Sequence, residues 1–176
     1  LSYNWTTDTG SPYDEVFVSI GENIRTTTVV PVELPPASDT GPAGMEGNGT
    51  ENDPYIITNV TQLQAMQQDP RAAYALGNDI DATVTAGWNE SSGFDPIGAT
   101  GDGESFDGFS GSLDGRNHTI HNLTIDRQDE ENVGLFARVV TGHVEHVALV
   151  GGNVTGGQRV GALVGTNQYG TISETA

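Results

Sequence analysis

The 176-residue chain contains no cysteine, no lysine and no long hydrophobic run. Without cysteine it can have neither a disulfide framework nor thiol chemistry. A membrane-spanning helix needs roughly twenty consecutive apolar residues, and no run approaches that length. We therefore expect no direct membrane span in this chain. The chain begins at Leu1 rather than at methionine, which predicts upstream processing or excision.

The charge balance is strongly one-sided. Six arginines face 24 carboxylates, and the net charge is −18 at pH 7. Such a chain repels nucleic-acid phosphates, so nucleic acid is excluded as a partner. Self-repulsion should destabilise the fold in dilute buffer, whereas the screening length falls to about 3 Å in about 1 M salt. An acidic, lysine-free composition resembles that of proteins from extreme halophiles. An ordinary acidic secreted protein is the alternative.

Asn-x-Ser/Thr sequons occur more often than the composition predicts. About two would be expected by chance, and seven are present. Asparagine and threonine are also favoured in turns and at strand edges, which raises the count without any glycosylation. We predict a glycosylated, extracellular cell-surface protein. The glycosylation sites would be Asn4, Asn48, Asn59, Asn89, Asn117, Asn122 and Asn153.

Residues 1–44 are predicted to form a β-hairpin-like segment followed by a Pro/Gly linker. Two β-prone runs, 15–20 and 24–30, flank a glycine-containing turn. Residues 35–44 have the proline and glycine content of a linker. A lone hairpin is only marginally stable, so we expect these strands to dock on the rest of the chain or on a missing segment.

A different pattern begins after the linker. Thr58 or Asn59 can cap a short helix that runs to about Gln68, with Leu63 and Met66 on one face. A strand and turn over 74–81 follow, then a long Gly-, Asp- and Ser-rich loop over 87–108, and then a strand and turn over 109–115.

The last third of the chain repeats itself. The run 133–137 recurs as 161–165 at an offset of 28, and residues 119–125 match 143–149 at an offset of 24. A repeat of about this length, rich in β-branched residues and punctuated by glycine, indicates a solenoid rather than a closed globule.

Several motifs follow one another in a familiar order: the segments 47–56, 78–81, 96–98, 109–115, 133–136 and 160–165. Together with the expected helix, this series resembles the GLUG-repeat right-handed parallel β-helices. These recur in large microbial surface proteins, adhesins and the stalks of IgA-cleaving peptidases. The resemblance implies an all-β fold for residues 45–176, a right-handed parallel β-helix (solenoid) with a short N-terminal capping helix. Residues 1–44 match no family that we recognise.

In such a solenoid each coil stacks its inward apolar side chains on those of the next coil. The offset of 28 predicts that Leu135 stacks on Leu163 and that Phe136 stacks on Val164. The two offsets together predict a third ladder, made of Ile120, Val144 and Ile172.

Few residues suggest catalysis or metal binding. Asp79 and Asp81 are the nearest candidates for a hydrolytic carboxylate pair, but a structural role in a turn is preferred. The histidines form two His-x-x-His pairs, 118 with 121 and 143 with 146. On adjacent coils His121 would lie over Glu145, an arrangement that could hold a metal ion, although solvated surface histidines are the preferred interpretation.

Two loops are rich in carboxylates: Asp102, Glu104 and Asp107 in one, and Asp126, Asp129, Glu130 and Glu131 in the other. Calcium binding at these loops is an alternative to simple solvation. Trp88, Phe94 and Phe106 could form a contact surface in the 87–108 loop, although such aromatics more often fold back on the solenoid. We therefore predict no catalytic, cofactor-binding or metal-binding residues.

The expected function is that of a non-enzymatic extracellular module of a halophilic microbe, serving in adhesion or as a spacer. Its rigid solenoid would display loops, above all 87–108, to other surface proteins, glycans or further copies of itself. Residues 171–176 begin a new coil without a cap, which predicts either a fragment of a longer chain or a filament subunit that assembles head to tail. A carbohydrate-active β-helix enzyme is the third alternative.

Overall fold

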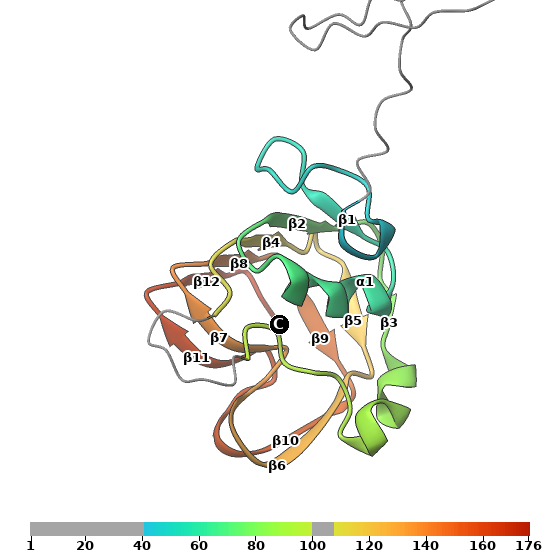
Figure 1. Ribbon diagram of the computed structural model, residues 1–176, viewed down its shortest axis with the longest axis vertical. Coiled ribbons are helices and arrows are strands. Elements are labelled where there is room, and N and C mark those ends of the chain that lie inside the picture. Colours follow the sequence, from blue (N-terminus) through green and yellow to red (C-terminus); the bar gives the residue numbers. More distant parts are fainter. Residues whose placement is uncertain (1–40, 100–107) are drawn as a thin grey trace, which may run out of the picture. The chain divides into compact units, whose positions relative to one another are not determined.

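The computed structural model describes residues 41–99 and 108–176, which form an all-β structure with one short α-helix (Figure 1). The chain divides into the units Leu1–Ser38 and Asp39–Ala176. The predicted hairpin over 15–30 and the start of the linker lie outside the described residues, so both stay predictions.

Twelve strands are present in the described part of the chain, and every pairing between them is parallel. The strands are β1 (Tyr55–Ile57), β2 (Ala73–Leu76), β3 (Ile80–Asp81), β4 (Ser112–Asp114), β5 (Thr119–His121), β6 (Thr124–Val133), β7 (Phe136–Val140), β8 (His143–Glu145), β9 (Ala148–Val150), β10 (Asn153–Val160), β11 (Val164–Gln168) and β12 (Thr171–Ser173).

The strands belong to four sheets, which the chain visits in rotation. The largest has the order β1-β2-β4-β8-β12, and the others are β3-β5-β9, β6-β10 and β7-β11. After β4 the chain passes through β5, β6 and β7 and returns to the first sheet at β8, then passes through β9, β10 and β11 and returns at β12. Each passage therefore adds one strand to each sheet, and no sheet closes into a barrel (Figure 1).

The core lies between these sheets. Leu113 and Val144 are aligned in neighbouring strands and fully buried, and Ile172 continues the row in β12. Tyr74 and Tyr55 extend this row in β2 and β1, and Tyr74 lies 5.6 Å from Tyr55 and 6.5 Å from Phe109 between ring centroids. Phe109 in turn lies 4.7 Å from Phe136. Such vertical contacts join one passage of the chain to the next and exclude water from the interior.

The predicted ladders are partly right. Phe136 pairs with Val164, and the Phe136 N–H donates to the Leu163 carbonyl, so the offset of 28 is confirmed there. Val144 also pairs with Ile172, as predicted. The placement of Ile120 in that ladder is wrong, because Ile120 lies in another sheet between Ile80 and Leu149.

The offset of 24 matched two corners rather than two stacked strands. Asn122 follows β5 and His146 follows β8, and both adopt positive φ, 59° and 54° respectively. In each run a buried position precedes the corner and another follows it, so the residue pattern is the same although the two strands lie in different sheets. The similarity between residues 119–125 and 143–149 therefore reflects two corners of the same backbone geometry.

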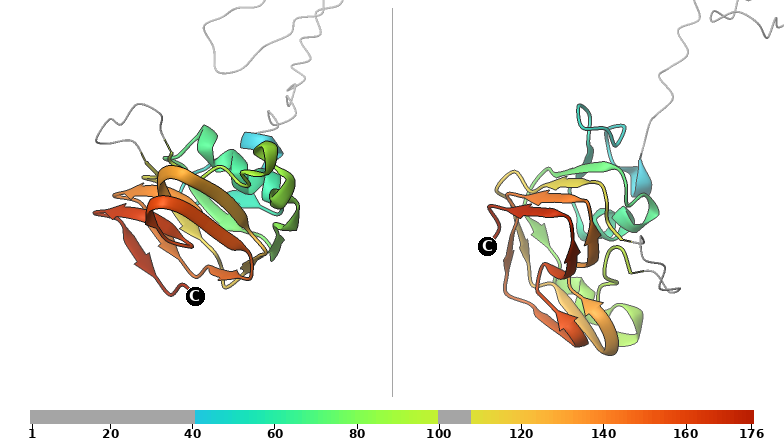
Figure 2. Two further views of the ribbon diagram at one scale, coloured as in Figure 1. Left: turned by 90° about the horizontal axis from the view of Figure 1, so that it is seen from below. Right: turned by 90° about the vertical axis from the view of Figure 1, so that its left-hand side faces the viewer.

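The expected helix is present as α1 (Val60–Ala65), continued by a 3-10 turn over Met66–Gln68. The Asn59 side chain accepts a hydrogen bond from the Gln62 N–H, so Asn59 is the N-cap. Leu63 and Met66 are fully buried in the same core as the strands. In Figure 2 the helix lies near β1, away from the C-terminal strands.

The described part of the long loop, residues 87–99, packs against the core. Phe94 and Ile97 are fully buried, and Trp88 stacks on Phe94 with 6.3 Å between ring centroids. These aromatics therefore fold back on the strands. Phe94 is therefore unavailable for a displayed contact, whereas residues 89–91 are exposed and the contact role of the loop stays a prediction; Phe106 and residues 100–107 lie outside the described residues.

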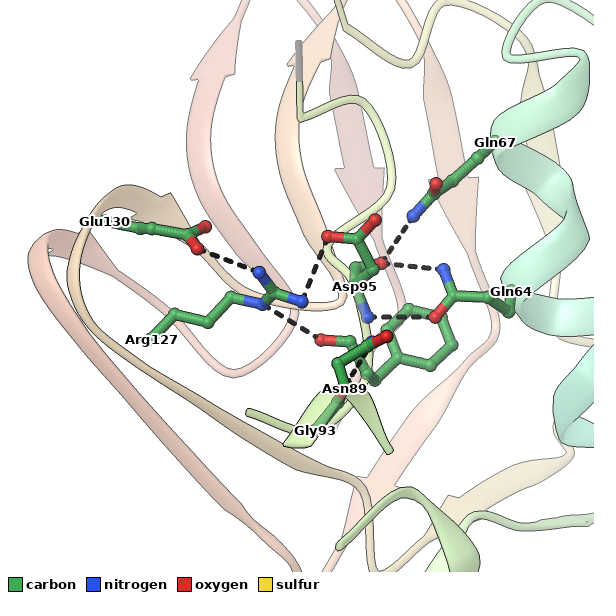
Figure 3. A network of polar contacts seen from close by, with 8 residues as sticks. Gln64, Gln67, Asn89, Gly93, Asp95, Arg127 and Glu130 are labelled. Carbon is green, nitrogen blue, oxygen red and sulfur yellow. Dashed lines mark hydrogen bonds and ion pairs between the residues drawn. The ribbon is translucent and has the colours of Figure 1, made fainter. Parts of the chain in front are cut away.

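A polar network fixes this loop between α1 and β6 (Figure 3). The Gln64 side chain makes two hydrogen bonds to the Asp95 backbone, of 2.8 and 2.9 Å, and Gln67 donates to the same carbonyl at 2.7 Å. On the other side Arg127 lies 3.1 Å from the Asp95 carboxylate and 2.8 Å from Glu130. The Arg127 side chain is only 12% exposed, so this ion pair is shielded from solvent better than most.

Candidate functional site

Asp79 and Asp81 flank the buried Ile80; the Asp79 carboxylate bonds to the next coil, and the Asp81 carboxylate bonds within the turn after β3. Asp79 accepts a hydrogen bond of 2.9 Å from the Thr119 N–H and lies 3.2 Å from the His118 ring. Asp81 accepts one of 3.0 Å from the Thr83 N–H. The bond from Thr119, followed by that from His118, lowers the pKa of Asp79, and bonds from the Thr83 side chain and backbone lower the pKa of Asp81. A general acid for glycoside hydrolysis requires the opposite shift.

The predicted stacking of His121 over Glu145 is wrong. His121 pairs in register with Asp81 and with Val150, whereas Glu145 lies in another sheet. The error follows from the offset of 24, which joined β5 to β8. Glu145 instead pairs with Asp114 in β4 and with Ser173 in β12.

That register brings an imidazole and two carboxylates together at the corner after β8. The ligand atoms of Asp114, Glu145 and His146 all lie within 4.8 Å of one another, and no other group of three such side chains in the described ranges converges in this way. Gly115 makes the close approach possible, because a Cβ at this position would collide with the His146 carbonyl. We name this group the corner cluster.

Each side chain of the corner cluster has a further contact. The His146 Nε2 lies 3.0 Å from Glu174, and the second Glu145 oxygen lies 3.1 Å from the His143 Nε2. Asp114 accepts a hydrogen bond of 2.9 Å from the Arg116 N–H. Partial desolvation lowers the pKa of His146, but the hydrogen bond to Asp114 and the charges of Glu174 and Glu145 outweigh it and raise that pKa above its ordinary value.

A groove of about 320 Å³ opens beside the corner cluster, on the outer face of the largest sheet. Glu51 and His143 are among its lining residues, together with Asp114 and Glu145 of the corner cluster. Arg116 also lines the groove, so three carboxylates face one guanidinium there, and the net negative charge favours cations over anions. Sequence patterns pointed to Glu145 and His146 but not to Asp114, because Asp114 and Glu145 are separated along the chain by a complete passage through the other sheets.

The second acidic group lies on a strand, not in a loop as predicted. Asp126, Asp129, Glu130 and Glu131 belong to β6, which pairs with β10 and contains an irregularity near Gly156. Arginines offset part of the charge, since Arg127 contacts Glu130 and Arg159 contacts Glu131 at 2.6 Å. Within the described ranges, no three of these carboxylates bring their oxygens together as a metal site would require. Asp102, Glu104 and Asp107 lie outside the described residues.

Six of the seven sequon asparagines lie in the described ranges, and all six are exposed. Asn4 lies outside. The side-chain amides of Asn48, Asn89, Asn122 and Asn153 donate hydrogen bonds to neighbouring groups. Within the described part of the chain, the amide groups of Asn59 and Asn117 donate none. No helix of this part is long and apolar enough to cross a membrane.

The parallel sheets define an all-β protein with one short α-helix in the described part of the chain. No protein-family model matches the chain. The chain is 47% identical to halomucin of Haloquadratum walsbyi over 133 residues, which are 72% of this chain but 1% of halomucin. It is 30% identical to a Gly-rich membrane protein, so named, of Evansella cellulosilytica, over 74% of this chain and 15% of that protein.

A solved structure shows similar architecture. A Bacteroides ovatus protein, assigned as an immunoglobulin A1 protease, matches with a TM-score of 0.50 and 27% identity, over 68% of this chain and 32% of that chain. The chain thus spans a small part of each relative. The similarity to halomucin and the lysine-free composition indicate an extracellular surface protein of a halophile, and the predicted extracellular or cell-surface location is confirmed.

Proposed function

We propose that this chain is a non-enzymatic spacer or adhesion module of an extracellular surface protein, built as a right-handed parallel β-helix of the GLUG type. The observation that carries the proposal is the return of the chain to the same sheet at β4, β8 and β12, always in parallel register. Each coil then contacts mainly its neighbours, so that coils can be added in one direction and the module can hold partners at a set distance.

The use of Asp79 and Asp81 supports a non-enzymatic role. Asp79 accepts hydrogen bonds from the next coil and Asp81 accepts them from the following turn. These bonds lower the pKa of both carboxylates, which favours the charged form that cannot donate a proton. If the module is not an enzyme, we expect no release of reducing sugar when the whole chain is incubated with acidic or neutral polysaccharides. Turnover that disappears in both Asp79→Asn and Asp81→Asn would instead support the carbohydrate-active alternative.

The pair β6 and β10 is the best candidate for a displayed surface. Residues 128–131 and 157–160 are exposed in these long strands, which extend from the sheets that hold the core (Figure 1). The surface is mainly acidic at 129–131, so it suits cationic or hydroxyl-rich partners better than anionic ones. We propose it as a second contact region beside the exposed residues 89–91 of the long loop.

A cross-linking experiment tests the coiled architecture. Thr119 and Ala148 are register partners in β5 and β9, and parallel neighbours lie about 4.8 Å apart, within the range of a disulfide. Since the chain has no cysteine, Thr119→Cys combined with Ala148→Cys should oxidise to an intramolecular disulfide. The control is Thr119→Cys with His143→Cys, which the offset of 24 would pair. Cross-linking of the control but not of the first variant would refute the proposed coil.

Size and binding measurements separate the roles that such a coil could have. A spacer is a discrete monomer at high protein concentration and shows no saturable glycan binding. An adhesion module is also monomeric but binds a glycan or surface protein saturably, and substitution of Glu130 and Glu131 by Gln weakens that binding. Growth of fibres with concentration, seen by light scattering, would replace both roles with that of a filament subunit.

A further inference from the structure

The corner cluster has the composition and geometry of a metal site. We propose that Asp114, Glu145 and His146 bind a divalent transition-metal ion of the Zn²⁺ type, which ties neighbouring coils together. The ligands come from two successive strands of the largest sheet, and Glu174, which follows β12, supports them from a third.

The distances are close to those that a metal ion requires. The His146 Nδ1 lies 3.2 Å from the Asp114 Oδ1 and 4.0 Å from the Glu145 Oε1. Ligands at about 2.0–2.2 Å from a tetrahedral zinc ion lie roughly 3.3–3.5 Å apart. The Asp114–His146 edge therefore already fits, whereas Glu145 must approach more closely, since the three ligand atoms lie within 4.8 Å of one another.

The contacts around the ligands match those of protein metal centres. A metal-bound imidazole generally donates its other N–H to a carboxylate, which fixes the ring orientation. In this corner the Nδ1 faces the two candidate ligands while the Nε2 faces Glu174 at 3.0 Å. The Arg116 N–H holds Asp114, and His143 holds the second oxygen of Glu145 at 3.1 Å.

The ligand types select the class of metal. One imidazole with two carboxylates suits Zn²⁺ and neighbouring first-row ions, whereas Ca²⁺ takes six to eight oxygen ligands. The three side chains are 30–43% exposed, and the adjoining groove gives access from solvent. The ion would keep open positions for water, so this would be a clip between coils rather than a closed structural site.

The chain supplies its own matched control. His118 and Asp79 also face each other across neighbouring coils at 3.2 Å, but among the residues that the structure describes no second carboxylate completes that pair. His118→Gln removes an equivalent surface imidazole and leaves the corner cluster intact. His146→Gln and Asp114→Asn remove ligands, and Glu174→Gln removes the supporting carboxylate.

The test is calorimetric titration of the untagged whole chain with Zn²⁺, in concentrated salt of one fixed composition, so that competition by its anion for zinc is the same for every variant. We expect one saturable site, retained in His118→Gln, weakened at least tenfold in His146→Gln and Asp114→Asn, and weakened about 10–100-fold in Glu174→Gln. Co²⁺ in place of Zn²⁺ should give a visible absorption band that His146→Gln removes.

Three results would overturn the proposal: no saturable binding, equal weakening in His118→Gln and His146→Gln, or Ca²⁺ binding that His146→Gln leaves unchanged. Since a variant could misfold, the imidazole ¹⁵N spectrum of the unaltered chain provides a second measurement. Addition of Zn²⁺ should shift the His146 Nδ1 resonance and leave that of His118 in place. A shift at neither or at both would also count against the site.

Discussion

Individual aspartates stabilise the corners of this chain through hydrogen bonds, and they also make its surface acidic. Asp79, Asp81 and Asp114 each accept a backbone N–H from a turn or from the next coil. A hydrogen bond to an ionised carboxylate is stronger than one between neutral groups, so these residues stabilise local structure while they add to the net charge. The resulting pKa shifts make this contribution measurable.

Protonation of Asp79 should destabilise the protein. The folded-state pKa of Asp79 is lowered, so its contribution is present above the unfolded-state value of about 3.9 and is lost as the pH falls through the folded-state value. Asp79→Asn should lower the free energy of unfolding at neutral pH and reduce the loss below about pH 4. Denaturant titration at a series of pH values, in constant high salt, measures both effects.

The control for this experiment is Asp129→Asn. Asp129 is exposed on β6, and in the described part of the chain its side chain makes no hydrogen bond or ion pair. The control should therefore leave the pH dependence close to that of the unaltered chain. If the free energy of unfolding depends on pH in the same way in both variants, the hydrogen bonds that Asp79 accepts from the next coil do not stabilise the fold.

Glycan occupancy should follow the freedom of each asparagine amide. The amides of Asn59 and Asn117 donate no hydrogen bond within the described ranges, whereas those of Asn48, Asn89 and Asn122 do. We expect the mass from the native host to exceed 18.5 kDa and peptide mapping to give the highest occupancy at Asn59 and Asn117. An unmodified mass there would contradict the glycosylation prediction.

At the scale of secondary structure, the sequence predicts elements that carry a local signal. The helix was predictable because Asn59 is a good cap and Leu63 and Met66 lie on one face. The offset of 28 was predictable because β7 and β11 have similar lengths and register. Ile120 was misplaced because its corner residue Asn122 imitates the one after β8, so local similarity could not tell which strand lies above which.

The candidate site shows the same limit. The corner cluster joins Asp114 to Glu145, and their separation along the chain depends on the lengths of β5, β6 and β7. No short motif records those lengths. The acidic run in β6 shows the converse, since its carboxylates are neighbours in sequence and yet no three of them converge within the described ranges.

The α1 cap gives a test at this scale. In an unglycosylated preparation, Asn59→Ala should lower the free energy of unfolding by about 1 kcal/mol, because the Gln62 N–H loses its acceptor. Thr61→Ala removes the same sequon but keeps the cap and introduces a better helix former, so it should be neutral or slightly stabilising. Denaturant titration compares the two. Equal destabilisation by both would show that the cap does not stabilise the helix.

At the scale of the whole molecule, the charge of −18 opposes folding. In the described part of the chain, Arg127 and Arg159 contact carboxylates, but the remaining acids far outnumber such contacts. Surface ion pairs each contribute little, so they cannot offset the summed repulsion. We therefore expect the folded state to be stable only when salt screens this repulsion.

This requirement predicts the shape of the salt dependence. The screening length falls from about 10 Å at 0.1 M to about 3 Å at 1 M, so most of the gain from screening should occur below about 1 M. We expect the β-type circular dichroism to be lost near 0.1 M KCl and the melting temperature to rise steeply up to about 1 M. Sucrose at equal osmolality acts by exclusion from the surface and should restore much less. A steady rise beyond 1 M, matched by sucrose, would attribute the effect to exclusion. A melting temperature that does not change with salt would remove the halophilic interpretation of this acidic surface.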